Sequence, residues 1–216
     1  MNCPNCQTAN PDAAKFCMNC GHALADEIMP SIRQWGFAFL AEAYFRQGDL
    51  AAGREALAQS QVGFHPDQPP GAFSPIYIPL AEARLALAEG DYGCAVTLMD
   101  VLIARLRQYG LRAWLAEALY LKGKALLEQN RLEEARATLA EGRLEAESTG
   151  SRRVLWPILV QLAQAEARRG NTGEAGDLRR QAQEIVIFMA DRMGTAELRT
   201  TFMSLADARS IFEEIS

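Results

Sequence analysis

Apolar residues recur at helical spacing along most of this chain, from Ser31 to its end. The same stretch is rich in Ala, Leu, Glu, Gln and Arg, which favour helix, and it holds few strand signals. The pattern predicts eight long helices, then one or two short helices over residues 195–214. Pro157 falls inside the seventh, where we expect a kink or a helix start shifted to Trp156. The eight long helices are expected at residues 31–47, 50–62, 77–89, 92–109, 112–129, 132–148, 152–169 and 173–192.

The helices recur as pairs. Short turn strings begin at Gly48, Gly90, Asn130 and Gly170, with spacings of 42, 40 and 40 residues. A small residue stands seven positions before each string and another stands five positions after it. Helices approach closely only where small side chains meet, and a paired unit buries its apolar face by stacking on neighbours. We expect Gly123 to face Ala135 in the third pair. The eight small residues are Ala41, Ala83, Gly123, Ala163, Gly53, Ala95, Ala135 and Ala175.

This helix-turn-helix unit resembles the tetratricopeptide repeat, which carries small residues in the same two places. The consensus period is about 34 residues, so the helices here are longer. The resemblance implies an all-α helical-hairpin solenoid whose concave groove, lined by the first helix of each pair, binds a protein or peptide. The expected partner-binding residues in that groove are Tyr44, Arg84, Tyr120, Lys122 and Gln161.

The last third of the chain, residues 151–214, carries a second resemblance. It is similar to the terminal repeats of bacterial signalling proteins that join an adenylate/guanylate cyclase domain, an ATPase and a repeat tail. The sequence contains no G-x-x-x-x-G-K-[ST] phosphate loop and no cyclase-length α/β region, so neither activity carries over. Gly53, inside a helix, and Arg179 depart from the repeat, and the first and last pairs are therefore expected to be less regular caps. The equivalent positions of the earlier pairs hold Leu57, Met99 and Leu139.

Four cysteines lie within the first twenty residues, as two C-x-x-C motifs separated by ten residues: Cys3, Cys6, Cys17 and Cys20. This spacing predicts a closed tetrahedral site for one structural Zn²⁺ ion. Four protein ligands leave no open position for catalysis. Metal binding also explains how so small a segment folds without a core of its own. A disulfide pair in a secreted protein and a redox motif are the alternatives.

The string CPNCQTANPDAAKFCMNCGHAL resembles the double zinc ribbon class of bacterial zinc ribbons. It shares the opening C-P-x-C, the Lys-Phe-Cys before the second motif and the closing C-G-x-x-L. The resemblance covers about a tenth of the chain and implies a metal site, but no particular function. Such ribbons head many unrelated proteins.

Composition narrows the function classes. Apolar residues make up 49% of the 216 residues, enough for a sizeable core and too many for a disordered chain. The net charge of -5 argues against nucleic acid as the main partner, because phosphate binding needs a basic surface. No stretch approaches the roughly 20 apolar residues of a membrane span, and no basic-then-apolar leader opens the chain. We therefore expect a cytoplasmic protein, in which thiolates survive to bind metal.

Few residues offer catalytic chemistry. The two histidines, His22 and His65, lie outside any catalytic motif, and no nucleophile or metalloprotease motif is present. Cys94 is interpreted as a small core residue. The proline-rich connection 65–75 is interpreted as a spacer, with a binding lid as the alternative. We expect a protein that is not an enzyme.

The predicted organisation is a zinc ribbon over 1–24, a linker over 25–30, and over 31–216 a solenoid of about four helix pairs with a C-terminal capping helix. The function predicted is a protein-interaction scaffold or adaptor, and self-association is left open. The alternatives are a regulatory or ligand-sensing module acting with a separate ATPase, cyclase or transcription factor, and a nucleic-acid binder using the ribbon. The last is weakened because Lys15 is the ribbon's only cation.

Overall fold

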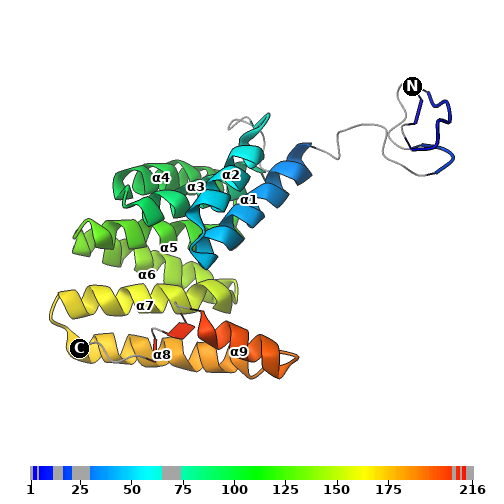
Figure 1. Cartoon of the computed structure of the whole chain (residues 1–216). Coiled ribbons are helices and arrows are strands. Elements are labelled where there is room, and N and C mark those ends of the chain that lie inside the picture. Colours follow the sequence, from blue (N-terminus) through cyan, green and yellow to red (C-terminus); the bar gives the residue numbers. More distant parts are fainter. Residues whose placement is uncertain are drawn as a thin grey trace.

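The computed structural model describes residues 2–3, 5–11, 17–20, 30–64, 74–205, 208–209 and 211–212. Within these residues the long elements are all helices, stacked as antiparallel pairs (Figure 1), which confirms the all-α helical-hairpin class. The proline-rich connection falls almost wholly outside the described residues, as do His22 and His65. The described helices are α1 Pro30–Gln47, α2 Leu50–Gln61, α3 Ser74–Glu89, α4 Tyr92–Gln108, α5 Arg112–Glu128, α6 Leu132–Ser148, α7 Arg152–Arg168, α8 Thr172–Ala190 and α9 Ala196–Ser204.

The predicted ends of the eight long helices are correct to within two residues except at the start of α3, which involves proline. Helix α3 begins at Ser74, three residues before the predicted start, because Pro75 lies in the first turn, where its missing N–H has no intrahelical partner. Helix α7 begins at Arg152, so the shifted start at Trp156 is wrong. Pro157 lies within α7 as Pro79 lies within α3. Each removes one backbone hydrogen bond, and buried residues on both sides hold the helix together.

The turns within the pairs follow the repeated strings. The backbone φ at Gly48, Gly90, Asn130 and Gly170 is 81°, 79°, 58° and 86°, a left-handed conformation that glycine and asparagine tolerate best. In the first two pairs an aspartate then caps the second helix. Asp49 Oδ1 accepts from the Ala52 amide and Asp91 Oδ1 from the Cys94 amide, both at 3.0 Å. These local signals explain why the pairs were visible in the sequence.

All eight small residues of the repeat are buried. A Cβ atom at Gly123 would lie 2.4 Å from Leu139 Cγ, and one at Gly53 would lie 2.2 Å from the Phe45 ring. Glycine is therefore required where these helices meet. The close contact of the third pair involves Leu139, one turn beyond the expected Ala135.

The first helices of the pairs form one layer. Helix α1 contacts α3, α3 contacts α5, and α5 contacts α7, while each also packs on the second helix of its own pair. Figure 1 shows the pairs following one another along the stack. We call the face of α1, α3, α5 and α7 that lies away from the second helices the first-helix surface. None of the described helices is both long and apolar enough to cross a membrane.

Arg179 holds the C-terminal segment against the last pair. Its Nε donates to the Ile211 carbonyl at 2.8 Å, and Gln183 Nε2 donates to the same oxygen at 3.0 Å. Ile211 and Ala208 are fully buried in the core that α7 and α8 help to form. The departure of Arg179 from the repeat therefore has a structural reason, since a buried carbonyl needs a donor.

Candidate metal centre and first-helix surface

The four predicted cysteine ligands lie together, with their sulfurs within 4.8 Å of one another. Cys3 Sγ is 3.7 Å from Cys20 Sγ, and Cys6 Sγ is 3.5 Å from Cys17 Sγ. Zn–S bonds of about 2.3 Å in a tetrahedron give sulfur–sulfur edges of about 3.8 Å, whereas a disulfide needs about 2.05 Å. All four are free cysteines. The site therefore fits one structural zinc ion with four thiolate ligands.

Hydrogen bonds tune these thiols unequally. Hydrogen bonds with the side chain and the backbone of Thr8 lower the pKa of Cys6 to about 5. A hydrogen bond with the backbone of Cys20 lowers the pKa of Cys17. Burial raises the pKa of Cys3 to about 11. A thiol that coordinates a metal ion is deprotonated outright, so filling the site releases protons.

Asn10 joins the two halves of the metal site, a role that the sequence did not predict. The residue is buried, and its Oδ1 accepts the backbone N–H of Met18 at 2.9 Å. Its Nδ2 donates to the Thr8 carbonyl at 2.7 Å and lies 3.6 Å from Cys17 Sγ. Such contacts orient the ligands of a metal site.

A row of ion pairs crosses the first-helix surface. Glu117 of α5 is buried, and both Arg84 of α3 and Arg153 of α7 pair with its carboxylate, the latter at 2.6 Å. Glu42 of α1 lies 3.5 Å from Arg84. Burial alone would raise the pKa of Glu117, but the two arginines outweigh it and hold the pKa at about 2. The network links all four first helices.

Four aromatic side chains cluster at one end of this surface. The rings of Phe39 and Tyr77 are 4.6 Å apart, those of Trp35 and Phe39 5.4 Å, and those of Tyr77 and Trp114 6.4 Å. Trp114 Nε1 donates to the Tyr77 hydroxyl at 3.2 Å. Trp35 is 38% exposed and Phe39 42%. The sequence reading missed this cluster, although Trp35 and Tyr77 stand 42 residues apart, the spacing of the first two turns.

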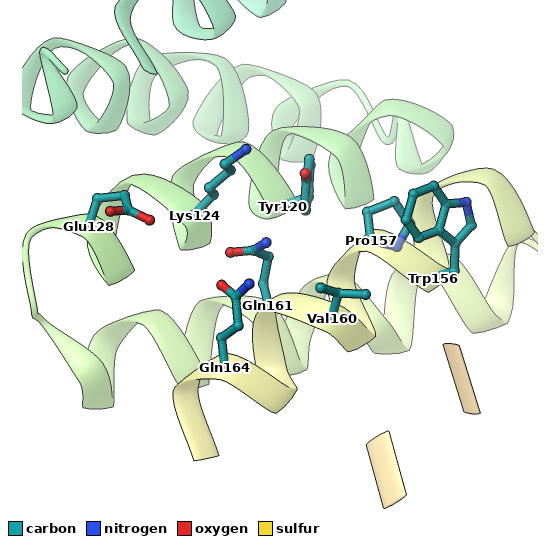
Figure 2. Close-up of a pocket in the computed structure, with 8 residues that line it drawn as sticks. All are labelled: Tyr120, Lys124, Glu128, Trp156, Pro157, Val160, Gln161 and Gln164. Atoms are coloured by element: carbon teal, nitrogen blue, oxygen red, sulfur yellow. The ribbon is translucent and has the colours of Figure 1, made fainter. Parts of the chain in front are cut away.

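A pocket of about 170 Å³ lies between α5 and α7. Figure 2 shows side chains from both helices converging on it. Gln161 is 8% exposed, and its Oε1 has no hydrogen-bond partner among the described residues. The lining residues are Tyr120, Lys124, Glu128, Trp156, Pro157, Val160, Gln161 and Gln164.

The structure brings only some of the predicted partner-binding residues together. Tyr120 and Gln161 line the same pocket. Arg84 belongs to the Glu117 network, and Tyr44 packs against the core of the first pair. Lys122 pairs with Asp100 of α4 at 2.6 Å, so its ammonium group points toward the second helices. The binding role of all five stays a prediction.

Cys94 is exposed near the start of α4, so its interpretation as a core residue is wrong. It is the third residue of the helix, and its backbone amide donates a hydrogen bond to the N-cap residue Asp91. The buried small residue of this turn is the next one along the chain, Ala95.

Comparison with known proteins identifies the metal module alone. Residues 2–24 match the family model of a zinc-ribbon domain, a span that includes all four cysteines. No curated protein matches the chain. The zinc-ribbon resemblance is thus confirmed for the N-terminal tenth, and the tetratricopeptide and cyclase-tail resemblances stay predictions.

Proposed function

We propose that this protein is a non-enzymatic scaffold that binds a partner protein in extended form along the first-helix surface. The observation that carries the proposal concerns two buried polar atoms. Arg84 Nη1 and Gln161 Oε1 are buried without a hydrogen-bond partner among the described residues, and both belong to first helices. Buried polar groups are nearly always paired, so each such exception needs an explanation. A bound peptide offers a backbone carbonyl to the first and an N–H donor to the second.

The exposed aromatic cluster supports the same surface. Trp35 and Phe39 stay partly exposed beside Tyr77 and Trp114, although aromatic rings are the side chains that gain most from burial. Tryptophan, tyrosine and arginine are also the residues that most often dominate binding energy at interfaces. In this proposal the zinc ribbon is a structural or accessory docking module, and the protein acts in the cytoplasm.

The test is a selection of random peptides on the immobilised full-length, zinc-loaded protein. Peptides that bind should lose at least tenfold in affinity to the Trp35→Ala/Phe39→Ala double variant. The matched controls are Val101→Ala on α4 and Leu144→Ala on α6, which remove exposed apolar side chains from second helices. Equal losses in the controls, or recognition that survives in residues 1–24 alone, would overturn the proposal.

A second candidate is a ligand-sensing module that acts with a separate ATPase, cyclase or transcription factor. The pocket between α5 and α7 favours it, because a volume of about 170 Å³ suits a small group. A metabolite that raises the melting temperature of the isolated protein, with no peptide selected, would support this candidate over the first.

A further inference from the structure

The pocket between α5 and α7 gathers hydrogen-bond acceptors that the fold leaves unused. Gln161 is more than nine-tenths buried, and its Oε1 has no partner in the described part of the chain. Glu128 lines the same pocket and takes part in none of the ion pairs found among the described residues, whereas Glu117, Glu141 and Glu145 each pair with an arginine. Figure 2 shows the Glu128 carboxylate and the Gln161 carbonyl oxygen turned toward each other across the gap between the helices. A ligand that meets both must be a hydrogen-bond donor.

The other end of the pocket is aromatic (Figure 2). Trp156 is 8% exposed and Tyr120 is partly buried, and both line the cavity beside Pro157 and Val160. Aromatic faces attract cations, and a planar guanidinium group stacks on them better than a compact, strongly hydrated ammonium group. A ligand with several donors in one plane and a positive charge therefore suits both ends of the pocket.

The volume of the pocket limits how large a group it can surround. A cavity of about 150 Å³ holds one benzene molecule, so about 170 Å³ accommodates a single planar group of that size. We propose that this pocket receives the guanidinium group of one arginine side chain from the bound partner peptide, with Glu128 and Gln161 as acceptors and Tyr120 as an aromatic wall beside them. This inference rests on the proposed function and specifies one side chain of its partner.

Lys124 makes the inference sharply testable. It lies one turn before Glu128 on the same helix and lines the same pocket, and no ion pair engages it among the described residues. Its positive charge opposes a cationic ligand and would favour an anionic one. Arg180 of α8, which pairs with Asp177 at 2.7 Å and does not line the pocket, serves as the control cation.

The probe is a fluorescein-labelled peptide with one arginine flanked by alanines, compared with its citrulline counterpart, which has the same shape and no charge. Fluorescence polarisation on the full-length, zinc-loaded protein should show tighter binding of the arginine peptide, with affinity falling as salt rises. Free L-arginine should bind more weakly than the peptide, because the partner backbone contributes contacts. Equal binding of the arginine and citrulline peptides, or no binding of either, would overturn the inference. Tighter binding of free arginine would reject the peptide as its source.

Four variants complete the experiment. Glu128→Gln and Gln161→Leu should each weaken arginine-peptide binding by about tenfold or more, the usual effect of losing a hydrogen bond to a charged group. Lys124→Gln should strengthen it a few-fold, and Arg180→Gln should leave it unchanged. Weaker binding by Lys124→Gln would show that Lys124 attracts the peptide instead of opposing its charge, and would overturn the inference. Equal melting temperatures for the variants show that folding is intact.

The two proposals can fail separately. If selected peptides depend on Trp35 and Phe39 but carry no arginine and ignore Glu128, the arginine pocket is rejected and the scaffold stands. If the arginine peptide binds through Glu128 and Gln161 while the aromatic double variant has no effect, the arginine pocket stands and the extended surface is rejected.

Discussion

Glu117 is the residue whose replacement should most clearly lower the free energy of unfolding of this protein. Replacing Glu117 with Gln keeps the side-chain shape and removes the charge. Arg84, whose side chain is only 13% exposed, then loses its nearest carboxylate and keeps Glu42 at 3.5 Å. Breaking a buried ion pair by removing one partner typically costs about 3–5 kcal/mol. The fall of the Glu117 pKa from 4.5 to about 2 corresponds to about 3 kcal/mol on folding. We expect the free energy of unfolding at pH 7 to drop by about 3 kcal/mol.

The pH dependence of this stability difference provides a test that can refute the reasoning. Because the pKa of Glu117 is depressed in the folded protein, its contribution is complete above about pH 4.5 and is lost as the pH falls toward 2. The difference in unfolding free energy between the wild type and Glu117→Gln, from urea titrations followed by helical circular dichroism, should therefore shrink over this range. Comparing both proteins at each pH cancels the acid loss of zinc. A difference below about 0.5 kcal/mol at pH 7, or one that is the same at pH 3, would refute the reasoning.

Three other expectations follow from the structure. A strong chelator should remove one zinc per chain and leave the helical circular dichroism signal largely intact, because the helices bury their own core; a large loss of helix would show that the ribbon caps the stack. Gly123→Ala should lower the free energy of unfolding by about 1–3 kcal/mol, since its Cβ would meet Leu139. Gly176→Ala, where the added Cβ meets open space, should raise the free energy of unfolding by up to about 1 kcal/mol. Equal effects of the two substitutions in denaturation experiments would refute the packing at Gly123. Arg179→Leu should release the segment at Ile211, so that proteolysis becomes faster there while cleavage elsewhere in the chain keeps its rate. Unchanged cleavage of this segment would contradict the anchoring role of Arg179.

The sequence alone determined the features that depend on residues close together in the chain. The two C-x-x-C motifs fix four ligands because each spans three residues, and the family match over residues 2–24 agrees. The strings at Gly48, Gly90, Asn130 and Gly170 predicted the turns because a left-handed residue is a local requirement. Helical spacing likewise placed α6 at residues 132–148 as predicted.

Only the tertiary structure decided which polar groups meet. Glu117 reads as one more charge on a helix, yet it contacts Arg84 and Arg153, which lie 33 and 36 residues away. Lys122 and Lys124 have the same chemistry and differ by two positions, but the twist of α5 turns one toward α4 and the other into the α5–α7 pocket. Burial, partner and pKa depend on the packing of helices from different repeats. Periodicity specifies which face of a helix is buried, and the stacking of the pairs specifies what that face meets.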